Sequence, residues 1–307
     1  MLRYALQRLL IAIPTLLVII TIAFFLMRLA PGGPFNLEQG LHPTVLANLN
    51  KLYKLDQPLY IQYFDYLKGL ASGNLGPSYV LPDFTVNELF ARGLPVSIII
   101  GGSALALALV LGVIFGVIAA LRQNEKADYA VVAFAAAGST IPTFVVAPIL
   151  QLTLGIWLGL LPVGGWNNGA LHNIIMPVLV LTFPQIAVIA RLTRASMIEA
   201  LRSHHIRTAR ALGLPSHVIV IKHALRSAIL PIVSYLGPAA AALLTGSMVV
   251  ESIFGIPGIG RYFVESALNR DYTVVMGTVV VVACMVIIFN LIVDLAYSVL
   301  DPRVRYS

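Results

Sequence analysis

The feature that most constrains this chain is the length of its uncharged stretches. No Asp, Glu, Lys or Arg occurs between Tyr129 and Ala190, and the stretches Leu9–Met27 and Leu94–Leu121 are also free of charge. A helix crosses the hydrocarbon core of a bilayer with about 20 predominantly apolar residues. Each stretch is long enough for that, and the longest exceeds one helix. The chain is therefore predicted to be an integral membrane protein.

Composition supports a lipid environment. Charged residues make up 11% of the chain, against about 25% in a soluble domain. The net charge of +7 does not indicate nucleic-acid binding, because Lys and Arg lie between apolar stretches and not on a soluble basic face. The single cysteine, Cys284, excludes an intrachain disulfide and a metal site built on several thiolates. We expect a lipid bilayer around the chain, and no nucleic acid, metal or cofactor bound to it.

The pattern predicts an all-α fold with six transmembrane helices. The first occupies residues 1–30 and is expected to stay uncleaved, because its apolar core exceeds the about 7–15 residues of a signal peptide. Residues 31–93 contain charges and Pro-Gly breakers, and they predict a periplasmic lobe with short helices near Pro43–Leu55 and Tyr60–Leu70. The other spans are expected within a core of residues 94–300, at about 95–121, 129–160, 173–190, 227–250 and 272–300.

The distribution of basic residues predicts the orientation. Six spans place both termini on one side, and 13 of the 20 Lys and Arg lie on that side. Most of these are in the segment 191–226, and two are in the tail 301–307. Because cytoplasmic loops carry the excess of Lys and Arg, both termini are expected to be cytoplasmic. Glu251 and Asp294 are expected near the membrane surfaces, which argues against a proton-coupled transporter acting alone.

ATP hydrolysis by this chain is not expected. A P-loop requires a Gly immediately before its Lys, so that backbone amides and the ammonium group hold the phosphates together. None of the five lysines follows a Gly. The chain is therefore predicted to be non-catalytic, and any ATP that drives it is hydrolysed by another subunit.

The basic segment 191–226 contains a distinctive motif. A stretch rich in small residues ends at Gly213, which favours a left-handed helix cap, and Pro215 prevents the helix from continuing. Small residues let another protein approach the backbone closely, whereas the arginines would equally hold the loop to anionic lipid. The residues alone leave both interpretations open.

This motif resembles the conserved cytoplasmic loop of bacterial ABC-importer permeases. Its sequence, Arg207-Thr208-Ala209-Arg210-Ala211-Leu212-Gly213-Leu214-Pro215 followed by His223-Ala224-Leu225, is similar to the oligopeptide and dipeptide branch, in which Thr208 takes the place of the sugar-type Glu. The spacing from Gly213 to Pro231 is likewise longer than in the sugar branch. Other segments resemble the B-type subunit of the oligopeptide permeases: 28–32, 164–171, 246–251, 257–260, 269–272 and 301–306.

The resemblance implies a type I ABC importer permease in the bacterial inner membrane, where this subunit forms half of the path for oligopeptides. Implied partners are a second homologous permease, two ABC ATPases that use ATP and Mg²⁺, a periplasmic peptide-binding protein and the peptide itself. Dipeptides, nickel or antimicrobial peptides are alternative substrates in the same family. An ATP-independent channel or secondary transporter is the alternative from another class.

The resemblance also assigns site residues. Coupling to the ATPase is expected at Arg207, Thr208, Ala209, Arg210, Ala211, Leu212, Gly213, Leu214 and Pro215. A periplasmic gate or contact with the binding protein is expected at Phe254, Pro257, Gly258 and Gly260. No substrate residue is assigned, because Gln151, Thr182 and Gln185 would either line the path or form hydrogen bonds between helices.

Overall fold

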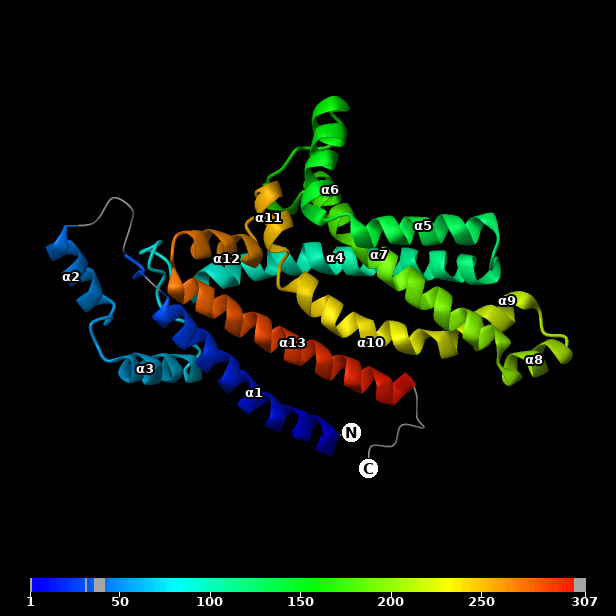
Figure 1. The fold of residues 1–307 in the computed structure, drawn as a ribbon, viewed down its shortest axis with the longest axis horizontal. Helices are drawn as coiled ribbons and strands as arrows, with labels where there is room; N and C mark the ends of the chain where they lie inside the picture. The colour runs from blue at the N-terminus through cyan, green and yellow to red at the C-terminus, as the bar shows by residue number, and fades with distance from the viewer. Residues whose placement is uncertain (1, 31, 36–41, 301–307) are drawn as a thin grey trace.

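The computed structural model describes residues 2–30, 32–35 and 42–300, and its regular elements are helices (Figure 1). The expected tail Asp301–Ser307 lies outside these residues. In chain order the helices are α1 (Leu2–Leu29), α2 (Pro43–Leu52), α3 (Leu59–Ala71), α4 (Val86–Leu121), α5 (Lys126–Thr140), α6 (Thr143–Leu150), the π-helix η1 (Gln151–Trp157), the 3-10 turn η2 (Asn167–Gly169), α7 (Leu171–Arg202), α8 (His204–Ala211), α9 (Ser216–Val218), the π-helix η3 (Ile219–Ala224), α10 (Leu225–Leu244), α11 (Met248–Phe254), α12 (Ile259–Leu268) and α13 (Tyr272–Leu300).

Within the described residues, five helical stretches are long and apolar enough to cross a membrane: Leu10–Leu29, Val86–Leu121, Leu171–Arg202, Ser216–Leu244 and Tyr272–Ala296. A sixth span results if the pair Lys126–Thr140 and Thr143–Trp157, bent by 101°, counts as one. The helix expected at about 129–160 is therefore interrupted and not continuous. It breaks at Ile141, which is extended, because Pro142 disfavours helical geometry in the residue before it.

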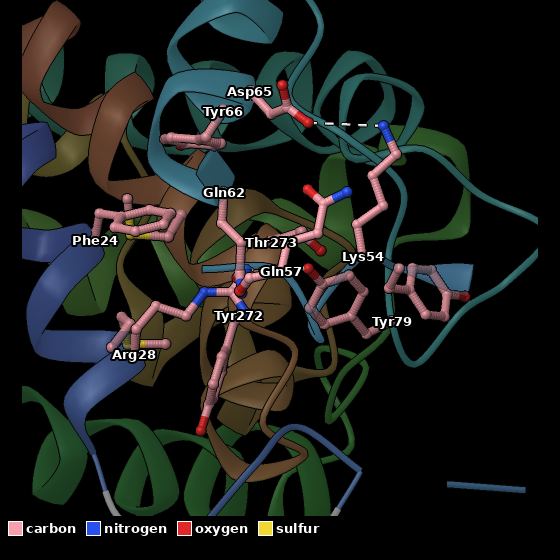
Figure 2. A pocket seen from close by; sticks show the side chains of 13 residues that line it. Phe24, Arg28, Lys54, Gln57, Gln62, Asp65, Tyr66, Tyr79, Tyr272 and Thr273 are labelled. Atoms are coloured by element: carbon pink, nitrogen blue, oxygen red, sulfur yellow. Dashed lines mark hydrogen bonds and ion pairs between the residues drawn. The ribbon is translucent and has the colours of Figure 1, made fainter. Parts of the chain in front are cut away.

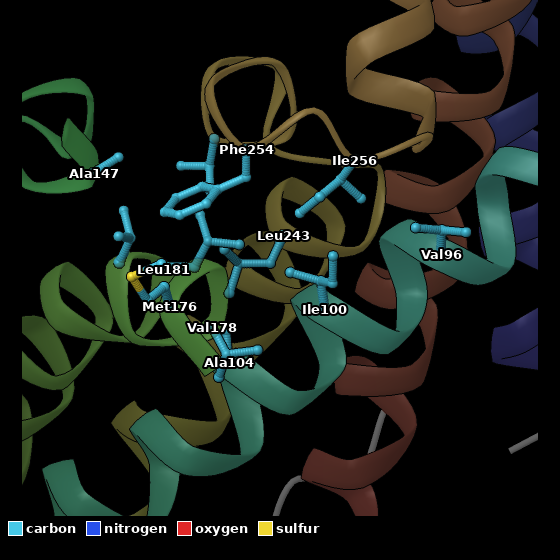
Figure 3. Packing of buried hydrophobic residues seen from close by; sticks show 12 residues of the cluster. Val96, Ile100, Ala104, Ala147, Met176, Val178, Leu181, Leu243, Phe254 and Ile256 are labelled. Carbon is cyan, nitrogen blue, oxygen red and sulfur yellow. The ribbon is translucent and has the colours of Figure 1, made fainter. Parts of the chain in front are cut away.

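The spans lie side by side in one bundle with two distinct ends (Figure 1). One end carries α8 and α9, and the opposite end carries α12 and the lobe helices α2 and α3. The α4–α7 contact depends on small residues, since a Cβ at Gly112 would lie 2.7 Å from Ile189 Cβ. Small residues are the usual means of close helix approach in membranes. An apolar cluster from α4, α6, α7 and the α11 region lies nearer the α12 end (Figure 3).

Three helix boundaries differ from the expected ones for local reasons. α4 begins at Val86 and not near residue 95, because Thr85 and Glu88 form a capping box with hydrogen bonds of 2.8 and 3.2 Å. α7 continues past residue 190 to Arg202. α10 ends at Leu244 instead of near 250, since Gly246 has a φ of +94° and separates α10 from α11.

The lobe contains α2 and α3 close to the two expected positions, and it is attached to the bundle in two places. The carboxylate of Asp271, before α13, is buried and accepts hydrogen bonds from the Ser78 hydroxyl and from the amides of Tyr79 and Val80. On α3, the Tyr63 hydroxyl lies 2.6 Å from the Thr21 hydroxyl of α1. The lobe is thus fixed to both α1 and α13.

Candidate functional site

The motif at the end of α7 folds as a short helix held against the bundle. α7 stops where Ser203 becomes extended, and its hydroxyl donates to the Ala200 carbonyl at 2.6 Å. α8 follows at once. Ile206 is fully buried, and it belongs to one apolar cluster with Met197 of α7 and Ala224 of η3. This packing places α8 across the ends of two spans.

Ala209 requires a correction to the expected surface. It is 6% exposed and belongs to the same internal cluster as Ile206. Because α8 turns about 100° per residue, Ile206 and Ala209, three residues apart, share one inward face. Ala209 therefore fixes α8 to this chain and does not offer its own side chain to a partner protein.

The opposite face of the motif is open. Leu212 is 75% exposed and Leu214 is 36% exposed, although both are large and apolar. The other exposed residues of the predicted coupling set are Arg207, Thr208, Arg210, Ala211, Gly213 and Pro215. These two leucines lie beside Arg207 and Arg210 in the sequence, and arginine is enriched at protein interfaces.

The end of α8 has the geometry predicted for Gly213. Its φ is +74°, its amide donates to the Arg210 carbonyl at 3.0 Å, and the Leu214 amide donates to Ala209 at 3.3 Å. These two bonds form a Schellman motif, in which a glycine in the left-handed region ends a helix. Nothing lies within 4 Å of an added Cβ at Gly213, so only backbone conformation requires glycine here.

A buried ion pair supports this end of the bundle. Arg194 of α7 donates to both carboxylate oxygens of Asp128 at 2.5 and 2.7 Å, and the Asn124 amide adds a third bond at 2.9 Å. The Asp128 side chain is 3% exposed. The sequence did not predict this pair, because Arg194 lies within the basic segment 191–226 and its partner is 66 residues away. The available signal was an acidic residue, Asp128, in the short charged segment 122–128 that precedes the long uncharged stretch.

At the opposite end, the turn from α11 to α12 is fixed by Glu251. This residue was expected near a membrane surface, and it lies outside the candidate spans, but its side chain is buried within the protein at 1% exposure. Its carboxylate accepts from the Ser97 hydroxyl of α4 at 2.7 Å and from the Arg261 amide of α12 at 3.2 Å. Burial raises the pKa of Glu251, partly offset by these hydrogen bonds. A polar link therefore joins α4, α11 and α12 inside the protein.

The expected gate residues pack inside this turn. Phe254 is 2% exposed, Gly258 and Gly260 are buried, and Pro257 is half-buried. A Cβ at Gly260 would lie 2.7 Å from the Met248 amide nitrogen, which explains the glycine. A direct contact of Phe254, Gly258 or Gly260 with a binding protein is therefore excluded in this conformation. Their packing remains compatible with a gate.

Three polar residues were considered as lining for a path, and each has a partner within the chain. Thr182 donates to the Val178 carbonyl at 2.6 Å, and Gln151 donates to the Val163 carbonyl at 2.7 Å. Gln185 accepts from Tyr235 at 2.5 Å. The last bond joins α7 to α10. Within the described residues, no cluster of three or more His, Cys, Asp or Glu side chains has the arrangement of a metal site.

Comparison with known families gives two matches along the chain. Residues 112–306 match the family described as binding-protein-dependent transport system inner membrane component. Residues 1–79 match the N-terminal region of such membrane components.

Curated relatives align over the full length. The oligopeptide transport system permease protein OppB of Salmonella typhimurium is 54% identical and that of Haemophilus influenzae 51% identical, each covering 100% of both chains. The dipeptide transport system permease protein DppB of Bacillus subtilis is 45% identical, over 99% of this chain and 98% of its own.

Among solved structures, an inward-facing form of the MetNI methionine ABC transporter has a TM-score of 0.60 at 19% identity. The match covers 69% of this chain and 96% of that chain. At this identity the likeness concerns the fold alone.

Proposed function

Because this chain belongs to the family of binding-protein-dependent transport system inner membrane components, we propose that it forms half of the translocation path of an ATP-driven oligopeptide importer. It is a non-catalytic, multi-pass subunit of the inner membrane. The observation that carries the oligopeptide assignment is the identity of 54% with an oligopeptide permease over the full length of both chains. The relative at 45% identity makes a dipeptide the second candidate substrate.

The architecture follows the type I importer permeases in this proposal. The bent pair α5 and α6–η1 counts as one span, which gives six and places both termini together. The α8 end of the bundle faces the cytoplasm, as the excess of Lys and Arg there favours. The α12 end and the lobe face the periplasm. The TM-score of 0.60 to an importer fold supports this arrangement.

The α8 segment is the coupling element in this assembly. Two ABC ATPases use ATP and Mg²⁺ below the membrane, and one of them receives Leu212 and Leu214 as apolar anchors. Arg207 and Arg210 flank these anchors and supply charge, while Ile206 and Ala209 hold the segment to the spans. A second homologous permease completes the path, and a periplasmic binding protein delivers the peptide.

The α11–α12 turn is the periplasmic gate in this proposal. Its core residues Phe254, Pro257, Gly258 and Gly260 pack within the turn, and Glu251 connects it to α4. When ATP closes the ATPases, the spans move as rigid bodies between two arrangements. The turn would then move with α4 through the Ser97–Glu251 bond.

The test is reconstitution in vesicles. The chain purified with a second permease, two ATPases and the binding protein should import a labelled oligopeptide only when ATP is enclosed with the ATPases. The chain without ATPases should not move the peptide on an ion gradient. Uptake driven by an ion gradient alone would refute the proposal and favour a secondary transporter. Uptake of dipeptides in preference to oligopeptides would support the second substrate.

A further inference from the structure

A pocket between α1, α3 and the start of α13 plays no part in the proposed path. Its volume is about 130 Å³, similar to an apolar cavity of about 150 Å³ that holds benzene. Aromatic rings make up much of its wall, among them Phe24, Tyr53, Tyr66 and Tyr79. Figure 2 shows the side chains of Gln57 and Gln62 near its centre, between the rings of Phe24, Tyr66 and Tyr79.

Three residues that line this pocket carry a buried oxygen atom without a hydrogen-bond partner in the described structure: Gln57 Oε1, Gln62 Oε1 and the Tyr66 hydroxyl. The orientation of Gln62 is determined by its other end, since Nε2 donates to the carbonyls of Gln57 at 2.7 Å and Leu55 at 3.2 Å. A flipped amide would lose both bonds. Burial raises the pKa of Tyr66, which keeps its hydroxyl protonated. Gln62 Oε1 is therefore a fixed acceptor, and a group that satisfies all three oxygens as they lie must donate hydrogen bonds to them.

The charges around the pocket limit the ligand further. Arg28 lies over the Phe24 ring at 5.5 Å and makes one long hydrogen bond, 3.4 Å, to the Tyr79 hydroxyl. Lys54 pairs with Asp65 at 3.6 Å on the rim. The positive charges of Arg28 and Lys54 outnumber the single carboxylate of Asp65, so binding of a simple cation is disfavoured. A zwitterion fits better, because its ammonium group can donate to the buried oxygens while its anionic group contacts Arg28.

The position of the pocket identifies where such a group comes from. Arg28 stands at the end of the span Leu10–Leu29, and the contact between Tyr63 and Thr21 places α3 alongside that span. The outer side of α3 exposes Tyr60 and Phe64, at 62% and 64%. Exposed aromatic residues at the end of a span are typical of the headgroup level of a membrane. The pocket therefore lies where phospholipid headgroups lie.

We propose that this pocket binds a phosphoethanolamine group, an ammonium next to a phosphate, supplied by a membrane phospholipid. The ammonium donates to Gln57 Oε1, Gln62 Oε1 and the Tyr66 hydroxyl, and the phosphate accepts from Arg28. The bound lipid then joins α3 of the lobe to α1 and α13. A choline headgroup has the same charge but no N–H donor, and a glycerol headgroup has no cation, so neither replaces it.

The experiment uses the full-length protein, purified with the subunits that accompany it and exchanged into nanodiscs of defined lipid. Native mass spectrometry measures retained lipid, and thermal unfolding measures its effect. We expect phosphatidylethanolamine to be retained at least about tenfold better than phosphatidylcholine or phosphatidylglycerol, because the loss of even one hydrogen bond to a charged group already predicts about that ratio. A thermal shift with soluble phosphoethanolamine alone would show that the headgroup suffices and would support the site.

Two conservative variants test the named atoms. Tyr66→Phe removes only the unpaired hydroxyl and keeps the ring that stacks on Phe24, while Gln57→Met removes one acceptor. Both should fold normally without ligand, because each deletes an unsatisfied polar atom, and both should lose most of the preference for ethanolamine. Tyr60→Phe is the matched control, since it makes the same change on α3 at a side chain that is 62% exposed and does not line the pocket. Equal retention of the three lipids by the wild type, or an unchanged preference in Tyr66→Phe, would overturn the proposal.

Discussion

Ser97 donates a 2.7 Å hydrogen bond to Glu251 across 154 residues of sequence, and both side chains are buried. Ser97 also accepts from the Ile259 amide at 3.0 Å, so one hydroxyl contacts both helices of the α11–α12 turn. A buried carboxylate without a cation beside it is costly. The hydrogen bonds from Ser97 and the Arg261 amide partly offset this cost and attach the turn to α4.

The stability of the protein should depend on pH through Glu251. Burial raises its pKa above the ordinary value of 4.5, so the folded protein binds this proton more tightly than the unfolded chain. The contribution of protonated Glu251 to the free energy of unfolding is therefore fully present below pH 4.5, and it is lost as the pH rises through the pKa of the folded state. Glu251→Gln, which resembles the protonated form, should flatten this part of a plot of Tm against pH. An identical slope in wild type and Glu251→Gln would contradict the assignment, and Glu251→Ala should lower Tm at every pH.

Breaking the Asp128–Arg194 pair should destabilise the α8 end. Asp128→Asn or Arg194→Met leaves one partner without its opposite charge, and loss of one member of a buried pair costs about 3 kcal/mol. Thermal unfolding of the purified protein measures this. The double variant should be less destabilised than the sum of the two single changes, because their effects are coupled. Additive effects would mean that the pair contributes little.

Leu212 provides the sharpest test of coupling. Leu212→Asp should leave expression unchanged, because the side chain is 75% exposed, and it should abolish peptide uptake and release the ATPase. Leu268→Asp is the matched control, with the same residue type at 79% exposure on the opposite end. It should retain the ATPase in co-purification. If Leu212→Asp retains an ATPase that responds to peptide, Leu212 is not an anchor.

The left-handed turn at Gly213 should tolerate residues according to their backbone preference. A β-branched residue disfavours a positive φ, so Gly213→Val should cost about 1–2 kcal/mol and reduce substrate-stimulated ATP hydrolysis. Gly213→Asn should behave almost as wild type, since Asn adopts this conformation readily and the space is open. Equal loss of coupling in both variants would point to side-chain size instead.

Orientation is testable with exposed single cysteines after replacement of Cys284. Ser72 lies after α3 and Ser216 lies after the α8 motif, and both are exposed. Ser72→Cys should react with an impermeant thiol reagent in intact spheroplasts, and Ser216→Cys only after permeabilisation. Ser78, another serine of the lobe, is unsuitable for labelling because its side chain is buried and hydrogen-bonded to Asp271. Labelling of Ser216→Cys from outside would reverse the proposed topology.

Much of the helical layout follows from the sequence, because charge-free stretches and breakers act locally. The apolar stretches predicted α1 and α13, and the cap at Gly213 has the expected geometry. The sequence contained a signal for the break at Ile141, because Pro142 disfavours helical geometry in the residue before it. The break was missed because apolarity alone does not distinguish a straight span from a bent one. The early start of α4 was missed because charged residues in its first two turns resembled the lobe.

The site was less predictable, because its key relationships are distant in sequence. Small residues in the α8 motif suggested a surface for close approach, but composition does not reveal that Ala209 faces inward and Leu212 outward. Likewise, Glu251 was expected at a membrane surface, and only the folded structure places it against Ser97. Which face of a short helix is covered depends on packing partners such as Met197 and Ala224, which no local pattern specifies.

The burial of Ile206 has a mechanical consequence. Close-packed side chains attach α8 to the end of α7 and to η3, which continues directly into α10, and protein interiors have low compressibility. A push on Leu212 therefore cannot be absorbed as bending of a slack loop. A displacement of α8 is instead passed on to both spans at once. In the proposed assembly, the ends of these spans should therefore move about as far as the ATPase surface that contacts α8.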